Sequence, residues 1–89
     1  MERTEMERLY EKYSDTVFRT AYSIVKNIAE AEDITSEVFM KLFTYEKNFE
    51  SEEHQKAWII RVTVNKCKDL FRSFHIKKTC YNGKLAGIL

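Results

Sequence analysis

Five residues between positions 58 and 72 have side chains of the kinds that bind nucleic acid. They recur at steps of three and four residues: Trp58, Arg61, Asn65, Lys68 and Arg72. On a helix this spacing places them along one edge. Cations neutralise phosphates, an indole offers a surface on which bases stack, and an amide can hydrogen-bond to base edges. An ordinary solvated helix face, with Trp58 capping the core, would show the same pattern, so the residues alone leave both interpretations open.

Other chemistries have little support in the sequence. His54 and His75 lie 21 residues apart, and neither has further ligands at the spacing of a metal site. No Ser or Cys has a plausible His/Asp arrangement around it, and no glycine-rich phosphate loop is present. We therefore expect no enzyme activity, no metal, no cofactor and no small-molecule substrate.

A second candidate surface is acidic. Glu32 and Asp33 stand near the start of a predicted helix, where the helix dipole favours negative charge, and Glu37 follows one turn later. Asp33 and Glu37 share a face, so a basic partner could bridge them. Dipole compensation alone would also explain these carboxylates.

The charge of the chain is divided sharply along its length. Residues 1–55 carry 7 Lys/Arg and 13 Asp/Glu, whereas residues 56–89 carry 8 Lys/Arg and only Asp69, giving nets of −6 and +7. This division suggests two surfaces with different partners, the basic one suited to a polyanion. Alternatively, the two halves simply neutralise each other within one fold.

The elements that must position these residues are predicted to be helices. The chain has no Pro, and its two glycines are Gly83 and Gly87. The residues that usually form the tight turns of a β-rich domain are therefore missing from the first 82 residues. Apolar periodicity predicts helices over about 4–26, 29–47 and 52–74. Ser14-Asp15 could divide the first into two, Asn27 could end it in the left-handed conformation, and Ser51 could cap the third. The expected fold is all-α, a compact bundle of three to four helices.

The third helix contains a β-branched centre, Ile59 to Val64, that could pass for a strand. A strand of about twenty residues without a turn would far exceed the usual length of roughly five or six. As a helix, one predicted apolar face gathers residues at steps of three and four: Ala57, Ile60, Val64, Cys67, Phe71 and Phe74, with Thr63 and Leu70 widening it.

Composition also bears on the compartment. No apolar run approaches the roughly 18 residues of a membrane span, and the first residues lack the apolar core of a signal peptide. Cys67 and Cys80 have neither CxxC spacing nor a disulfide-rich context. We expect a cytoplasmic protein with both thiols reduced and no membrane partner.

Together these segments resemble a known family. The runs AEDITSEVFMKLF and KAWIIRVTVNKCKDLFRS, joined by a short loop, resemble region 2 of bacterial sigma-70-like factors, in the extracytoplasmic-function (ECF) group. The opening run LYEKYSDTVFRTAYSIVKN is similar to the start of that domain, and the resemblance covers about Leu9 to Ser73. It implies a helical domain at 1–74 that binds the β′ clamp helices of core RNA polymerase. It also implies that the domain recognises and melts the −10 promoter element and holds its non-template strand.

The resemblance assigns roles by position. Asp33 and Glu37 would contact the polymerase together with Ser36, which stands where the family usually has Gln. Trp58, Arg61 and Asn65 match the DNA-facing helix, with Asn65 in the base pocket and Trp58 near the melted junction, and Lys68 and Arg72 would contact phosphates. The segment from Asn48 to Gln55 corresponds to the base-capturing loop.

Two further expectations concern what accompanies this domain. Residues 75–89 are expected to be a tail or the start of a linker, with no −35-binding domain present. The alternative function is a truncated sigma-like interaction module that occupies polymerase or an anti-sigma factor without opening DNA.

Overall fold

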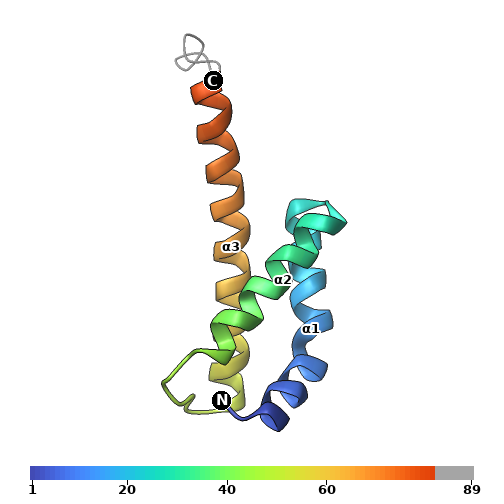
Figure 1. Ribbon diagram of the computed structural model, residues 1–89, viewed down its shortest axis with the longest axis vertical. Helices are drawn as coiled ribbons and strands as arrows, with labels where there is room; N and C mark the ends of the chain where they lie inside the picture. The colour runs from blue at the N-terminus through green and yellow to red at the C-terminus, as the bar shows by residue number, and fades with distance from the viewer. Residues whose placement is uncertain (82–89) are drawn as a thin grey trace.

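The computed structural model of the chain consists of three α-helices (Figure 1). They are α1 (Arg3–Val25), α2 (Ile28–Phe43) and α3 (Glu52–Tyr81). The structure describes the backbone of residues 1–81 and the side chains of residues 1–73, and this part of the chain contains no strand. The prediction of an all-α fold is therefore confirmed. The expected tail, residues 75–89, lies mostly outside the described residues, although α3 continues to Tyr81.

α1 is one uninterrupted helix. Its buried residues follow each other at four-residue steps and face the other two helices: Leu9, Tyr13, Val17 and Ala21. Ser14 and Asp15 lie within it, and the Asp15 carboxylate pairs with Arg19 at 3.0 Å on the exposed side. The alternative of two helices divided at Ser14-Asp15 is therefore wrong.

Only two residues connect α1 to α2. Lys26 adopts the left-handed conformation (φ 56°, ψ 33°), and its N–H donates to the Tyr22 carbonyl at 2.8 Å. Asn27 is extended, and its Oδ1 accepts the Glu30 N–H at 2.9 Å, which makes it the N-cap of α2. The prediction that Asn27 would end α1 in the left-handed conformation is wrong. The cap needs a side-chain acceptor, which Asn has and Lys lacks.

The segment between α2 and α3 is longer than the sequence indicated, because α2 ends at Phe43 rather than near Lys47. The Thr44 hydroxyl donates to the Lys41 carbonyl at 3.1 Å, which satisfies one of the free carbonyls at the helix end. α3 then starts at Glu52, where the His54 N–H donates to Ser51 Oγ at 3.0 Å. The prediction that Ser51 caps the third helix is confirmed.

The buried face of α3 is offset from the predicted one. Ile59, Thr63 and Cys67 are fully buried and Val62 nearly so, whereas Ala57 is exposed and Phe71 leaves 47% of its surface accessible. The predicted apolar face is therefore correct at Cys67 and Thr63, half-buried at Ile60 and Val64, and wrong at Ala57 and Phe71. Apolar side chains lie on several sides of this part of the helix, so periodicity alone could not show which side of the helix packs against α1 and α2.

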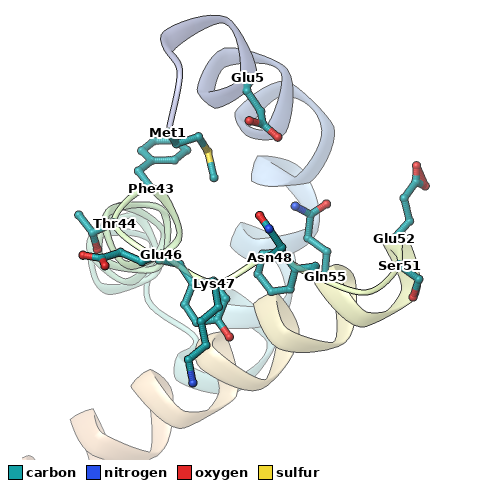
Figure 2. Close-up of a pocket in the computed structure, with 12 residues that line it drawn as sticks. Met1, Glu5, Phe43, Thr44, Glu46, Lys47, Asn48, Ser51, Glu52 and Gln55 are labelled. Carbon is teal, nitrogen blue, oxygen red and sulfur yellow. The ribbon is translucent and has the colours of Figure 1, made fainter.

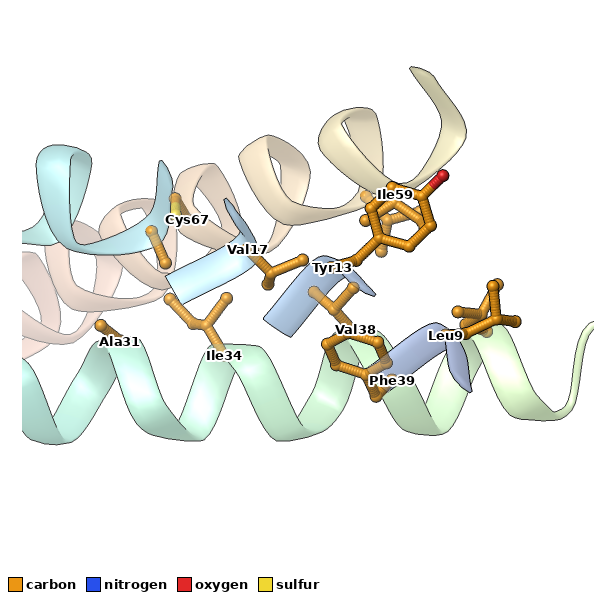
Figure 3. Packing of buried hydrophobic residues seen from close by; sticks show 12 residues of the cluster. Leu9, Tyr13, Val17, Ala31, Ile34, Val38, Phe39, Ile59 and Cys67 are labelled. Carbon is orange, nitrogen blue, oxygen red and sulfur yellow. The ribbon is translucent and has the colours of Figure 1, made fainter. Parts of the chain in front are cut away.

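All three helices contribute to one core (Figure 3). Its fully buried members come from each helix in turn: Leu9 and Val17, Val38 and Leu42, and Ile59 and Cys67. Burying one such aliphatic side chain is worth about 1.5–3 kcal/mol. Beyond this core, α3 continues past the ends of α1 and α2 (Figure 1).

Candidate functional site

The polar residues predicted along the third helix lie on α3 and face solvent. Helix geometry places them opposite the fully buried Ile59 and Thr63. We call this surface the α3 edge, and its four exposed members are Arg61, Asn65, Lys68 and Arg72. Thus the structure brings four of the five predicted nucleic-acid residues to one accessible surface.

One cation of the α3 edge has an internal partner. Arg72 Nη1 donates to Asp69 Oδ1 at 3.0 Å, and both side chains are well exposed, at 68% and 62%. An exposed pair at this spacing contributes at most about 1 kcal/mol. The guanidinium therefore remains able to exchange Asp69 for a phosphate.

Trp58, the fifth predicted residue, is half-buried in an aromatic cluster. Its ring centroid lies 4.7 Å from that of Tyr45 and 5.5 Å from that of Phe49, and the Tyr45 and Phe49 rings stack at 4.9 Å. We call Tyr45, Phe49 and Trp58 the aromatic cluster. It anchors the segment between α2 and α3, so part of the indole surface is already used within the protein.

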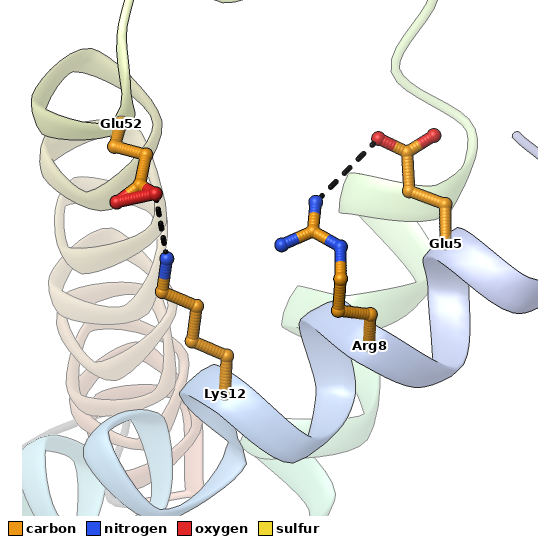
Figure 4. A network of polar contacts seen from close by, with 4 residues as sticks. All are labelled: Glu5, Arg8, Lys12 and Glu52. Atoms are coloured by element: carbon orange, nitrogen blue, oxygen red, sulfur yellow. Dashed lines mark ion pairs between the residues drawn. The ribbon is translucent and has the colours of Figure 1, made fainter.

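Polar contacts fix the same segment at the start of α3. The Glu50 N–H donates to His54 Nδ1 at 3.1 Å, and the His54 ring meets Phe49 edge-on at 5.4 Å. Across the molecule, Lys12 Nζ of α1 pairs with Glu52 Oε2 at 3.0 Å (Figure 4). The hydrogen bond from Lys12 lowers the pKa of the Glu52 carboxyl, and the same bond raises the pKa of Lys12. Residues 45–51 are thus held by contacts to α3, and the start of α3 is itself paired with α1 through Lys12 and Glu52.

A cleft of about 870 Å³ opens beside this segment, lined by the start of α1, residues 43–49 and the start of α3 (Figure 2). Its lining carries the carboxylates of Glu5, Glu46 and Glu52 and the ammonium of Lys47, while Asn48 and Gln55 supply amides. Carboxylates repel phosphates, whereas amides hydrogen-bond to base edges. The excess of carboxylates over cations in this lining suits an uncharged base better than a phosphate.

The predicted polymerase-binding residues lie together on the outer side of α2. Asp33, Ser36 and Glu37 are all exposed, and we call them the acidic face. Glu37 Oε1 forms an ion pair with Lys66 Nζ of α3 at 3.3 Å, although 46% of the Glu37 side chain stays accessible. Asp33 lines a shallow cleft of about 320 Å³ with Lys66 and Asp69. The acidic face is therefore open to a cationic partner at Asp33 and shared with Lys66 at Glu37.

An exposed methionine adjoins the acidic face. Met40 follows Ser36 by four residues and Glu37 by three, so it lies beside them on the helix surface. It leaves 69% of its surface accessible.

The described residues offer nothing that points to other chemistry. Cys67 is a free, buried thiol, and burial raises its pKa, which keeps it protonated and unreactive. Cys80 lies outside the residues whose side chains are described. In the described part of the chain, no group of three or more His, Cys, Asp or Glu side chains is placed to bind a metal ion. No helix in the same part is both long enough and apolar enough to span a membrane.

A family model, Sigma-70 region 2, matches residues 9–74. The chain belongs to the sigma-70 region 2 family. The match includes the acidic face, the aromatic cluster and the α3 edge, so every candidate surface lies inside the region that defines the family.

Curated relatives place this region 2 chain in the ECF group. It is 35% identical over 85 residues (88% of the chain) to "ECF RNA polymerase sigma factor BldN" of Streptomyces coelicolor. It is 32% identical over 66 residues (74% of the chain) to "ECF RNA polymerase sigma factor SigE" of Mycolicibacterium smegmatis. It is 28% identical over 60 residues (67% of the chain) to "ECF RNA polymerase sigma factor SigW" of Bacillus subtilis.

The aligned parts cover only 30%, 25% and 32% of those three proteins. No solved structure matches the chain significantly. The comparisons therefore establish the family of this domain, and the chain spans only about a quarter to a third of the length of these relatives.

Several contacts of this region 2 domain have no local signal in the sequence. Lys66 and Glu37 lie 29 residues apart, and Lys12 and Glu52 lie 40 apart, yet each pair is joined by an ion pair. Tyr45 falls in a segment that the apolar pattern assigned to a helix. Spacing could have indicated that Tyr45, Phe49 and Trp58 were available to cluster, but not that the chain would turn to bring them together.

Proposed function

We propose that the chain acts in transcription initiation as a sigma-factor domain that binds core RNA polymerase and the non-template strand of the −10 promoter element. One observation carries this proposal: two exposed surfaces of opposite charge lie on different helices of one small core. The acidic face is on α2 and the α3 edge is on α3. Binding and strand separation need no bond-making chemistry, so no enzyme activity is part of the proposed role.

The acidic face supports the polymerase contact. Asp33 is exposed and pairs with no cation among the described side chains, and Ser36 beside it offers a hydroxyl. A partner helix bearing Lys or Arg, such as the proposed β′ clamp helices, would complement this charge and gain on-rate and specificity from it. Glu37 joins the contact by exchanging Lys66 for a cation of the partner.

The α3 edge supports the DNA contact. Arg61, Lys68 and Arg72 neutralise phosphates in the proposed complex, and Asn65 hydrogen-bonds to a base that has left the stack. Unstacking a base costs a few kcal/mol, which stacking and hydrogen bonds to the open strand recover. Trp58 contributes through the aromatic cluster, next to the cleft whose lining suits a base better than a phosphate.

A second candidate function has its own supporting observation. Because Tyr45 and Phe49 cover part of Trp58, the DNA side is partly closed, whereas Asp33 is already accessible. This favours an interaction module that occupies polymerase, or an anti-sigma factor, without opening DNA. Strand binding separates the two functions, since only the first requires it.

The polymerase contact is tested by charge reversal. We expect Asp33→Arg to weaken binding to purified core polymerase at least about tenfold, because like charges brought together across an interface cost several kcal/mol. The control is Glu11→Arg, which reverses an exposed carboxylate on α1. If the two variants bind core polymerase with equal affinity, the acidic face is not part of the polymerase interface.

The DNA contact is tested with a fluorescent single strand carrying a −10 sequence. We expect Asn65→Ala to weaken binding, and Lys68→Ala to reduce the dependence of log K on log salt by about 0.7, the value for one phosphate contact on a single strand. Wild-type protein that binds polymerase but not the strand would instead establish the interaction-module function.

A further inference from the structure

Phe71 is the exposed aromatic residue that stands next to the cations of the α3 edge. It leaves 47% of its surface accessible, although the sequence predicted it in the core. Lys68 precedes it by three residues and Arg72 follows it directly, so the ring and the Lys68 ammonium are neighbours on the helix surface. Cys67, one turn earlier, is fully buried, which places Phe71 at the border between core and solvent.

Trp58 is poorly placed to stack on a base near the C-terminal half of α3, because other rings already cover it and it lies far along the helix. Tyr45 and Phe49 already contact the indole, at centroid distances of 4.7 and 5.5 Å. Trp58 also lies 13 residues before Phe71, a rise of about 20 Å along the helix. A strand that follows Asn65, Lys68 and Arg72 would therefore pass Phe71 and leave Trp58 well behind.

We propose that Phe71 is the base-stacking residue of the α3 edge and that its ligand is single-stranded nucleic acid. The inference rests on the proposed function and adds a residue to its DNA-binding surface. Asn65, Lys68 and Phe71 form one row at steps of three residues, which rises about 9 Å and turns about 120° around the helix, so a strand that crosses from Asn65 over Lys68 meets the ring. The ring takes the face of the base while Lys68 and Arg72 hold the phosphates on either side.

Charge favours a nucleic acid over a protein as the partner of Phe71. Residues 56–89 carry a net of +7, and Lys68 lies next to the ring on the helix surface, with the exposed cations Arg61 and Arg72 about 80° and 100° around the helix from it. An apolar protein surface covering Phe71 would have to desolvate those cations, whereas phosphates pair with them. Duplex DNA keeps its bases stacked on each other, so the ring should distinguish open from paired strands.

The test compares variants on a short fluorescent single-stranded DNA and on the same sequence as a duplex. We expect Phe71→Ala to weaken single-strand binding by about 5- to 150-fold, the cost of losing one stacked base, with an unchanged salt slope and unchanged duplex binding. Phe71→Trp should restore the affinity. Tyr22→Ala is the matched control, because Tyr22 is an aromatic on α1 with a similar exposure of 41%. Thermal unfolding checks that each variant is folded.

The outcomes separate this proposal from the proposed function. If Asn65→Ala weakens strand binding and Phe71→Ala does not, the stacking role of Phe71 is wrong, while the DNA-binding role of the α3 edge is supported. If Phe71→Ala loses core polymerase binding but keeps strand binding, Phe71 belongs to a protein interface and the inference is overturned. Wild-type protein without single-strand affinity would refute both the DNA contact and the role of Phe71.

Discussion

Removing the Phe49 ring should loosen the segment between α2 and α3 and uncover Trp58. Within the aromatic cluster Phe49 packs against Tyr45 at 4.9 Å and Trp58 at 5.5 Å, besides its edge-on contact with the His54 ring at 5.4 Å. Each such pair is worth about 0.5–1.5 kcal/mol beyond the area it buries, so Phe49→Leu, which keeps an apolar side chain, should cost roughly 1–3 kcal/mol. In a domain of this size that lowers Tm by about 4–8 °C for each kcal/mol.

The chain carries one tryptophan, so its fluorescence reports on the aromatic cluster directly. We expect Phe49→Leu to shift the emission of Trp58 to longer wavelength, as water replaces the ring. Phe43→Leu is the control, because Phe43 is also half-buried but its ring partner is Phe39 rather than Trp58. If Phe49→Leu changes neither Tm nor the emission of Trp58, the aromatic cluster does not hold this segment and the reasoning is refuted.

Three further predictions concern a cap, an ion pair and a thiol. Asn27→Ala removes the acceptor of the Glu30 N–H and should lower the free energy of unfolding by about 1 kcal/mol in urea titrations, whereas Asn27→Asp should retain it; equal losses would argue against the cap. The Lys12–Glu52 pair lowers the pKa of Glu52 from its usual 4.5, so its stabilisation is present above pH 4.5 and is lost as the pH falls below it. The emission of Trp58 should report this acid transition, which Glu52→Gln should abolish. Cys67, buried and protonated, should react with a thiol reagent only on unfolding when measured in a Cys80→Ala background, and fast labelling of the folded protein would contradict its burial.

Local sequence signals predicted the helices and the exposed polar edge well. The absence of Pro and the late position of Gly83 and Gly87 pointed to helices, and Ser51 was correctly identified as a cap. The spacing of Arg61, Asn65, Lys68 and Arg72 correctly predicted that these residues share an exposed side of α3. These features depend on residues within a few positions of each other, which is the range over which helix periodicity and capping act.

What the sequence could not predict depends on contacts between distant residues. The buried side of α3 was misjudged because Ile59 and Ile60 are equally apolar, and only the position of α1 and α2 decides which of them packs. The covering of Trp58 by Tyr45 and Phe49 likewise required α2 to end before Tyr45. The site roles of Asp33, Ser36, Glu37 and the α3 edge remain predictions drawn from the family.

The ion pair between Glu37 and Lys66 ties the two proposed surfaces together energetically. A cationic partner that takes Glu37 releases the Lys66 ammonium, which lies on the α2 side of α3 rather than on the α3 edge, so the released charge acts on a strand at the α3 edge only over a distance and most strongly at low salt. Polymerase binding should then raise the affinity for a polyanion, and by thermodynamic reciprocity a bound strand should raise the affinity for polymerase by the same factor. On this basis the two proposed partners would bind cooperatively, with the Glu37–Lys66 exchange as the coupling element.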